Sequence, residues 1–426
     1  MLLAAIVGWC ASRWNVWFHN PEEAPYTPLS VPTRVLLTFG DEDGIRSRNV
    51  SWMCGEEVQA SYVELINLTS HLSPLTSYLI KASGEVFKSR SGKAAYYVAK
   101  LRGLKAGNSY RYRVCTGNKK SEWYKFHLPN RNEHETAFIY MGDIQDSIGG
   151  IANQFLRKAF RQNPDAEFFV CGGDLTERPT DAYWGETFAS LDSIGQAVPV
   201  LTVTGNHDYL KGVICQLERR FSLIHSYYLD SMIGENQVFT VRYKDIQIFC
   251  LDSNREPFYL WAQRQWLEEQ LTESEAKWKI VVLHHPLYSV RGEMNNLIQR
   301  WMFDDLIQEY GVNVVLQGHE HAYARRTGQN DKVAQHTDWP IYIISHCSPK
   351  GYRINPPEGR FDKIEKDIRT YQKVRISGDT LFLTAFDAVK GTLIDSLCIP
   401  HSNNNPPQLS QVELRSPSKV ELAKLK

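Results

Sequence analysis

Two histidines flank a glutamate immediately after an apolar run: residues 312–321 read VNVVLQGHEH, so His319 and His321 enclose Glu320. Side chains alternate along extended backbone, so we expect both imidazoles to share a face while Glu320 points away. Imidazole nitrogen is a common ligand of transition metals, and Gly318, which has no side chain, lets a ligand approach closely. A single pair of this kind also occurs as two ordinary structural histidines, so the rest of the chain must decide.

Four more polar clusters follow apolar runs that read as buried strands. They supply Asp143 and Gln145, then Asp174, then Asn206, His207 and Asp208, then His284 and His285. Each cluster alone has an ordinary explanation, such as an aspartate that caps a helix or a strand that ends at a proline. Five clusters at five strand ends together favour one shared binding site over five separate structural roles, because ligands of open α/β sheets bind outside the carboxyl ends of strands. We therefore predict that these side chains converge on one crevice.

The chemistry of this set indicates metal. Carboxylate, amide and imidazole groups without a thiolate suit Mn, Fe or Zn. The donors are too many for one ion and fit two ions about 3.5–4 Å apart that share one carboxylate. Such a pair lowers the pKa of a water held between its members and makes hydroxide available near neutral pH. We predict two divalent or mixed-valence ions of Mn, Fe or Zn as cofactors.

The order GD, GD, GNHD, H and GHEH resembles that of the calcineurin-like metallophosphoesterases, and the continuation GHEHAYARR is most similar to the purple acid phosphatases. The resemblance covers residue 32 to about residue 400. It implies these metal-binding residues: Asp143 and His321 at the first ion, Asn206, His284 and His319 at the second, and Asp174 between the two. It also implies that His207 faces the substrate phosphate as a catalytic acid, and we expect Asp208 to orient it. Arg325 and, at the rim, His285 are the expected substrate-binding residues.

Two positions depart from the purple acid phosphatase pattern. Glu177 stands where those enzymes have an iron-binding tyrosine, and Gln145 stands where they have a glycine. Residues 143 and 145 share a face at an extended strand end, so we expect Gln145 to bind the first ion. The alternative is an amide that only hydrogen-bonds nearby. We expect Glu177 to be a solvated residue at a helix start. Without the tyrosinate, an Mn, Zn or Fe(II) pair is favoured, and the protein should not be purple.

These residues predict an enzyme that hydrolyses phosphate esters with a hydroxide bridging two metal ions. A phosphomonoesterase similar to the acid phosphatases is favoured, with a phosphorylated small molecule as substrate. One alternative is a phosphodiesterase or nucleotide pyrophosphatase, because Asp-x-Gln occurs in such branches. A more distant alternative is a non-catalytic binding protein whose α/β domain is the relic of an enzyme. The sequence argues against it, because nearly every expected metal position carries a residue that can bind metal.

Two domains must position these residues. Residues 32–128 alternate apolar and polar side chains between turns, which predicts an all-β sandwich; its LxxL and YxYxV segments resemble the tyrosine corner of fibronectin type III domains, and Trp52 suits the core. Residues 136–400 alternate apolar strands with helical segments around one hairpin, which predicts an α/β catalytic domain with mixed sheets. An extended arm is expected at 13–31 and a flexible tail at 401–426.

The chain of 426 residues carries 48 basic and 48 acidic side chains, so we expect no nucleic-acid partner. No apolar stretch reaches the roughly 18 residues that span a bilayer. Residues 1–12 end in small residues and resemble the later part of a secretory signal, which predicts export to the periplasm, the cell surface or the medium; a buried first strand or helix is the alternative. The oligomeric state is left open.

Overall fold

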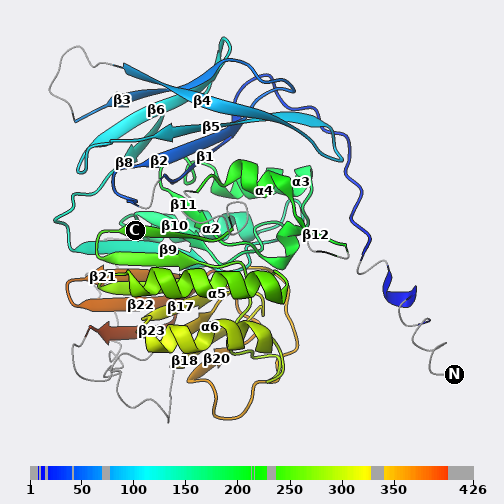
Figure 1. The fold of residues 1–426 in the computed structure, drawn as a ribbon, viewed down its shortest axis with the longest axis vertical. Coiled ribbons are helices and arrows are strands. Elements are labelled where there is room, and N and C mark those ends of the chain that lie inside the picture. Colours follow the sequence, from blue (N-terminus) through cyan, green and yellow to red (C-terminus); the bar gives the residue numbers. More distant parts are fainter. Residues whose placement is uncertain are drawn as a thin grey trace.

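The computed structural model describes residues 18–40, 43–69, 77–212, 214, 216–227, 237–327 and 340–401, together with residues 8 and 11–14. The expected signal segment lies largely outside these residues, and the expected tail lies outside them from residue 402 onward. Figure 1 shows a β domain, in blue and cyan, stacked on a larger α/β domain, in green to red.

The N-terminal domain is antiparallel, with its strands paired in the order β1-β2-β5-β4-β3-β6-β7 and β8 beside β6. The strands are β1 (Thr33–Phe39), β2 (Arg48–Met53), β3 (Ser61–Asn67), β4 (Ser77–Lys88), β5 (Lys93–Leu101), β6 (Ser109–Thr116), β7 (Lys119–Lys120) and β8 (Tyr124–His127). Along β6, Tyr110, Tyr112 and Val114 are buried while Arg111 and Arg113 are partly exposed, as the alternating pattern predicts. The predicted β-sandwich is confirmed.

Trp52 and Tyr110 organise the core of this domain. Trp52 is buried, stacks on Tyr97 with 5.4 Å between ring centroids, and donates its indole N–H to Oγ1 of Thr116 over 2.9 Å. The backbone N–H of Lys105 donates to the hydroxyl of Tyr110 over 2.9 Å. A tyrosine corner makes this kind of contact, between a tyrosine hydroxyl and the backbone a few residues upstream. The likeness to fibronectin type III domains therefore rests on one specific contact and stays a prediction.

The α/β domain contains two mixed sheets, with the strand orders β11-β10-β9-β21-β22-β23 and β14-β15-β16-β17-β19-β18-β20. The first consists of β9 (Glu135–Met141), β10 (Phe168–Cys171), β11 (Val200–Thr202), β21 (Thr370–Ser377), β22 (Thr380–Asp387) and β23 (Leu393–Pro400). The second consists of β14 (Phe239–Tyr243), β15 (Ile246–Cys250), β16 (Trp278–Val282), β17 (Val314–Gln317), β18 (Tyr323–Thr327), β19 (Ile341–Ile344) and β20 (Lys363–Glu365). A short pair, β12 (Tyr209–Leu210) and β13 (Gln216–Leu217), lies apart from both.

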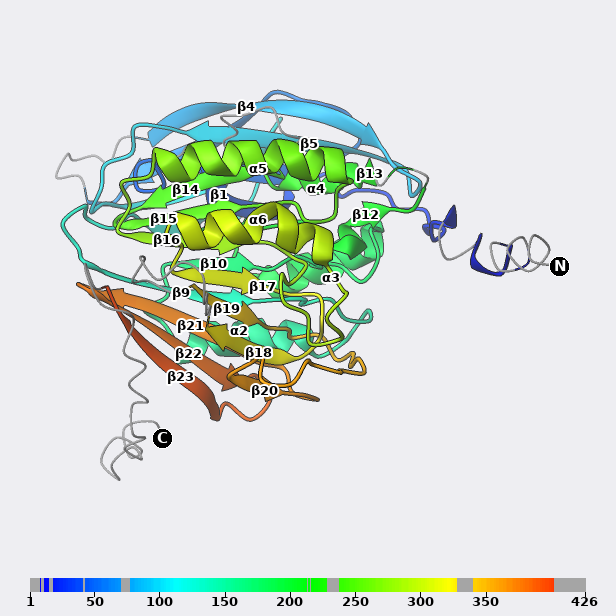
Figure 2. The ribbon, with the colours of Figure 1, turned by 60° about the horizontal axis from the view of Figure 1, so that its bottom comes forward.

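The two sheets pack face to face, and helices cover their outer faces. The core between the sheets includes Phe168 and Val170 of one and Ile280 and Val282 of the other. Helices α2 (Ala152–Gln162) and α3 (Asp181–Leu191) pack on the first sheet, and α5 (Pro257–Thr272) and α6 (Leu297–Glu309) pack on the second. The short helix α4 (Arg219–Ile224) lies against β2 and β5 of the sandwich. Figure 2 shows α5 and α6 side by side outside their sheet. The predicted α/β domain with mixed sheets is confirmed.

Parallel pairing brings the predicted site residues to one edge. Strands β9, β10 and β11 are parallel to one another, as are β15, β16, β17 and β19. The carboxyl ends of each parallel set therefore lie at one edge of its sheet, and ligands bind beyond such edges. The loops that follow these strands carry the five polar clusters.

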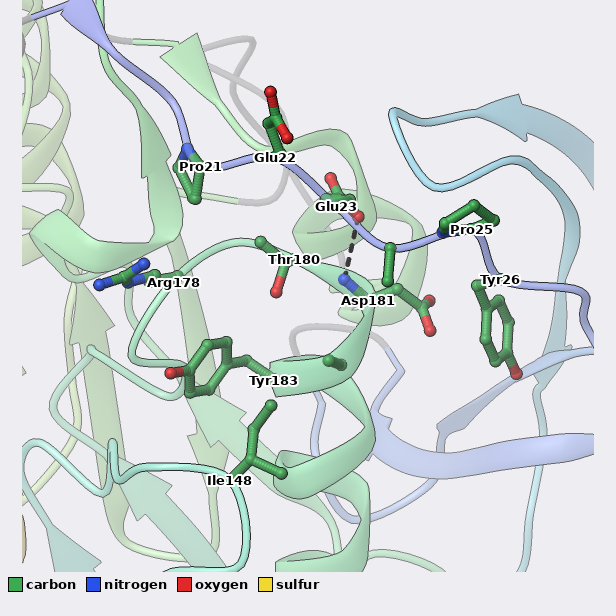
Figure 3. A pocket seen from close by; sticks show the side chains of 12 residues that line it. Pro21, Glu22, Glu23, Pro25, Tyr26, Ile148, Arg178, Thr180, Asp181 and Tyr183 are labelled. Carbon is green, nitrogen blue, oxygen red and sulfur yellow. Dashed lines mark hydrogen bonds between the residues drawn. The ribbon is translucent and has the colours of Figure 1, made fainter.

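An arm before the sandwich crosses both domains. Residues 19–29 contain no helix or strand. Glu23 accepts a hydrogen bond from the backbone N–H of Asp181 over 3.1 Å, drawn in Figure 3, and its carboxylate also lies 2.6 Å from the guanidinium of Arg220. Between the arm and the start of α3 lies a cavity of about 280 Å³ that Tyr26 and Tyr183 help to line. Within the described residues, no helix is both long and apolar enough to cross a bilayer.

Candidate metal centre

Each predicted metal-binding residue follows the end of a strand. Asp143 comes two residues after β9, Asp174 three residues after β10, and His319 two residues after β17. His284 comes two residues after β16, and Asn206 begins the 3-10 turn η1 (Asn206–Asp208) that follows β11. Loops of both sheets therefore contribute side chains to the space beyond the carboxyl ends of their parallel strands.

Three of these side chains meet at one point. Oδ1 of Asn206 lies 2.9 Å from Nδ1 of His319 and 3.1 Å from Nε2 of His284, and the two nitrogens are 3.2 Å apart. His284 is fixed in this orientation because its Nδ1 lies 2.8 Å from the carbonyl oxygen of Gly172, to which it donates. Its Nε2 therefore carries a lone pair, which is directed towards Asn206 and His319. Two imidazole nitrogens and an amide oxygen this close together are suited to a shared transition-metal ion.

Asp174 and Asp143 lie beside this group and are buried. Oδ2 of Asp174 is 3.5 Å from Nε2 of His284, and a possible ligand atom of each of Asp143, Asp174 and His284 lies within 4.8 Å of the others. Burial and then the charge of Asp174 raise the pKa of Asp143 well above its ordinary value. Burial also raises the pKa of Asp174, but electrostatic interactions with His284 and His207, together with the backbone hydrogen bond from His207, outweigh it and lower that pKa. Two buried carboxylates this close need a cation if both are to be ionised.

Gln145 and His321 form the other side of the cluster. Nε2 of Gln145 is 3.3 Å from Nε2 of His321, whose Nδ1 donates to the carbonyl oxygen of Lys350 over 3.0 Å. The Gln145 amide can turn over and present its oxygen at the same place. Oδ1 of Asp143 and Oε1 of Gln145 are buried and have no hydrogen-bond partner among the described residues, and such atoms call for an ion or a water. The residues present therefore fit a pair of transition-metal ions, because they offer carboxylate, amide and imidazole donors close together.

Comparisons with known proteins agree with this geometry. Residues 136–323 match the model of the calcineurin-like phosphoesterase family, and residues 32–128 match that of the purple acid phosphatase N-terminal domain. The chain thus combines a calcineurin-like phosphoesterase domain with a purple acid phosphatase N-terminal domain. The phosphoenolpyruvate phosphatase of Allium cepa is 25% identical over 379 residues, which cover 83% of this chain and 76% of that one. Purple acid phosphatase 17 of Arabidopsis thaliana is 24% identical over 270 residues, covering 55% of this chain and 75% of that one.

A solved structure shows the same fold. The purple acid phosphatase from yellow lupin (Lupinus luteus) seeds superimposes with a TM-score of 0.72 over 87% of this chain and 74% of that one, at 16% sequence identity. The resemblance drawn from the five motifs is thereby confirmed at the level of family and fold.

The backbone of this metallophosphoesterase departs from the extended conformation that we expected at the strand ends. Asp143, Asp174, His319 and His321 all have positive φ, between 42° and 71°. A non-glycine residue in this region costs of order 1–3 kcal/mol, and such strain concentrates at functional sites. The expectation that His319 and His321 share a face of an extended strand is therefore wrong. His319 contacts Asn206 and His321 contacts Gln145, so the two imidazoles face different parts of the cluster.

Two glycines of the motifs, Gly205 and Gly318, allow carboxylate oxygens to approach the backbone closely. A Cβ on Gly205 would collide with the carboxylate of Asp174, and a Cβ on Gly318 would lie 2.7 Å from Oδ2 of Asp143. The backbone N–H of His319 donates to that same Oδ2 over 2.5 Å. These glycines are required because carboxylate oxygens pack directly against the backbone.

The structure separates His207 from the aspartate that we expected to orient it. Nδ1 of His207 lies 2.6 Å from the carbonyl oxygen of Glu177 and donates to it, while its backbone N–H donates to Oδ1 of Asp174 over 2.8 Å. Asp208 is buried and accepts from the backbone N–H of Gly205 over 2.7 Å, so it shapes the η1 turn. Glu177, through its carbonyl, is thus the residue that orients His207.

Glu177 is not a solvated residue at a helix start, because α3 begins only at Asp181. Its side chain is 15% exposed and lies 2.5 Å from the ammonium of Lys350. No sequence pattern indicates this pair, because its members are 173 residues apart. Lys350 in turn presents its carbonyl to His321, so the ion pair joins two loops of the site.

The two expected substrate-binding residues have different surroundings. Arg325 is 8% exposed, and its guanidinium contacts Asp395 at 2.8 Å and Asp362 at 3.0 Å. Two carboxylates neutralise it inside the fold, so we assign Arg325 a structural role in place of the expected phosphate contact. His285 lies at the cluster, with its ring 4.3 Å from that of His319 and its Nδ1 3.1 Å from Oγ of Ser253. Burial and then the electrostatic interaction with His284 lower the pKa of His285 to about 3, which keeps it neutral.

Proposed function

We propose that this chain is a phosphomonoesterase that acts on phosphorylated small molecules with two transition-metal ions. The observation that supports it most is the meeting of Asn206, His284 and His319 within 3.2 Å, beside the buried carboxylates of Asp143 and Asp174. The first ion would be held by Asp143, Gln145 and His321, the second by Asn206, His284 and His319, with Asp174 between them. Similarity to a phosphoenolpyruvate phosphatase and to acid phosphatases supports the monoester as substrate.

When bound, such an ion pair supplies a water of lowered pKa and positive charge for the phosphoryl oxygens. The chain's own residues supply the rest. His207 is held by the Glu177 carbonyl through Nδ1, which leaves Nε2 free for a phosphoryl or leaving-group oxygen. In its protonated form that nitrogen can hand a proton to the leaving oxygen. Asn206 is exposed while Asp143 and His284 are buried, so the site is open to solvent at Asn206.

The ligand types support an Mn, Zn or Fe(II) pair. The tyrosine of the purple enzymes is replaced by Glu177, whose carboxylate is engaged by Lys350. Without a phenolate the preference for Fe(III) weakens, so the protein should lack a purple charge-transfer colour. Elemental analysis together with a visible absorption spectrum tests this. The expected result is two ions per chain without a purple charge-transfer band, and a purple protein would contradict it.

Steady-state rates on a monoester and a diester test the choice of substrate. Purified chain supplied with Mn²⁺ should show the higher kcat/KM on phenyl phosphate, and bis-phenyl phosphate should be the poorer substrate. A higher value on the diester would favour the phosphodiesterase alternative, for which Gln145 beside His321 is the relevant feature. A metal content near zero after growth with Mn, Fe and Zn would favour a binding protein instead.

We also infer export, from the apolar run at residues 1–12 alone. Mass spectrometry of the mature N-terminus tests this inference. A mature chain that starts near residue 13 supports it, and retention of Met1 contradicts it.

A further inference from the structure

A positively charged side chain, Arg291, lies near the candidate metal centre. Arg291 is exposed, and among the residues that the structure describes its guanidinium makes no ion pair. Arg325, the arginine of the expected motif, is neutralised by two carboxylates, whereas Arg291 keeps its charge available.

Glu320 fixes the loop that carries this arginine. The carboxylate of Glu320 accepts from the backbone N–H of Val290 over 2.6 Å and from the hydroxyl of Ser289 over 2.5 Å. Glu320 stands between His319 and His321, so the same turn that presents the two imidazoles also holds the residue before Arg291. The position of the guanidinium is therefore coupled directly to the metal centre.

Tyr352 holds the arginine from a second loop. The guanidinium of Arg291 lies over the ring of Tyr352, 4.7 Å from its centroid, and that ring is 4.3 Å from the ring of His321. The backbone N–H of Asn355 donates to the carbonyl oxygen of Val290 over 2.8 Å, which joins the two loops. A cation stacked on an aromatic face keeps its N–H edge free for an anion. Arg291 is thus placed beside the cluster, and within the described part of the chain its guanidinium donates no hydrogen bond.

We propose that Arg291, positioned by Glu320 and Tyr352, binds the terminal phosphoryl oxygens of the substrate and gives the site its selectivity for monoester dianions over diesters. This inference rests on the proposed function. A phosphate monoester carries a second negative charge near neutral pH, with a pKa of about 6, whereas a diester carries one. The diester also replaces a terminal oxygen by an alkoxy or aryloxy group, which accepts hydrogen bonds less well. A guanidinium therefore favours the monoester, which carries the larger negative charge and a third terminal oxygen to accept its N–H groups.

The test compares Arg291→Met with Arg300→Met, in metal-loaded protein. Arg300 also lies over a tyrosine ring, at 5.5 Å from the centroid of Tyr288, and is the matched control. A charge-assisted hydrogen bond contributes about 1.5–3 kcal/mol, or roughly a ten- to hundred-fold change in affinity. We expect Arg291→Met to weaken binding of inorganic phosphate, measured by calorimetry, by that factor. Its kcat/KM on phenyl phosphate should fall at least as far, while kcat/KM on the diester should change about threefold or less. Arg300→Met should leave all three values unchanged.

Two further variants separate positioning from folding. Arg291→Lys keeps the charge without the planar pair and should recover part of the phosphate affinity. Glu320→Gln should weaken phosphate binding in the same direction as Arg291→Met, with two metal ions per chain retained. Unchanged phosphate affinity in Arg291→Met, or an equal loss on monoester and diester, would overturn the proposal. A wild-type chain that binds no metal would instead refute the proposed function. Calorimetry of phosphate binding to metal-loaded wild type and Arg291→Met distinguishes this outcome from a failure of the Arg291 proposal.

Discussion

Oδ1 of Asn206 lies 2.9 Å from Nδ1 of His319, although 113 residues separate them in the chain. Asn206 follows β11 of one sheet and His319 follows β17 of the other. Each residue lies in a loop that starts at the carboxyl end of a parallel strand. Their contact therefore depends on the alignment of the two sheets, which brings these strand ends together. The same alignment brings His284 within 3.2 Å of both atoms.

Replacement of Asn206 tests the second ion. Asn206→Ala removes the amide oxygen from that ligand set, so metal content should fall from two ions per chain towards one. Turnover should fall at least a hundred-fold, because both ions share the charge of the phosphoryl group. Asn153→Ala, on α2, is the matched control, since its amide binds Glu186. Elemental analysis and kcat measure the two effects, and a variant that keeps two ions would show that Asn206 is no ligand.

Replacement of His207 should leave the metal sites intact and slow the reaction. We expect His207→Ala to retain two ions and to lose about 10²–10⁴-fold in kcat on an alkyl phosphate, whose leaving oxygen needs a proton. The loss should be smaller on p-nitrophenyl phosphate, whose leaving group needs none. His127→Ala, at an exposed strand position, serves as control. Equal losses on the two esters would remove His207 from the role of proton donor.

Stability should fall with acid because of His225. Burial lowers the pKa of His225 to about 3, against 6.5 for the free side chain, so the folded chain holds it neutral. The unfolded chain gains a proton as the pH falls below 6.5, and stability contributed by the neutral ring is lost between pH 6.5 and pH 3. The slope is about 1.4 kcal/mol per pH unit. In His225→Phe, urea unfolding at pH 4–7 should show a correspondingly shallower decline. A decline as steep as that of the wild type would contradict the assignment.

The arm should contribute to stability through Glu23. The side chains of Glu23 and Arg220 are both nearly fully buried, at 2% and 1% exposed, and lie 2.6 Å apart. Removal of one partner from a buried pair typically costs 3–5 kcal/mol, because the other charge stays buried. Glu23→Ala should destabilise the fold by about that amount, measured by urea unfolding at pH 7. Glu22→Ala, one residue earlier in the same arm, should cost less than about 0.5 kcal/mol.

The sequence allowed prediction of the β-sandwich, the α/β domain and the convergence of five clusters. These follow from local patterns: alternation along β6, apolar runs in β9 and β17, and polar residues where each run stops. Parallel strands then place the clusters at one edge without further information. The positive φ values at Asp143 and His319 were not predictable, because strain of this kind is imposed by the surrounding structure.

Residues whose roles depend on distant partners escaped prediction. Arg325 lies within the expected motif, yet Asp362 and Asp395 neutralise it from later parts of the chain. Glu177 pairs with Lys350, and Arg291 owes its position to Glu320. No local pattern marks these pairs. A free guanidinium beside a metal cluster becomes recognisable only when all carboxylates near it have been located.

Anomalous X-ray diffraction from crystals grown with Mn²⁺ tests the dinuclear centre most directly. We predict two anomalous peaks per chain about 3.5–4 Å apart, one beside Asn206, His284 and His319 and the other beside Gln145 and His321, with Asp174 between them. A single peak, or a pair of peaks away from Asp174, would contradict a dinuclear centre at this edge of the two sheets.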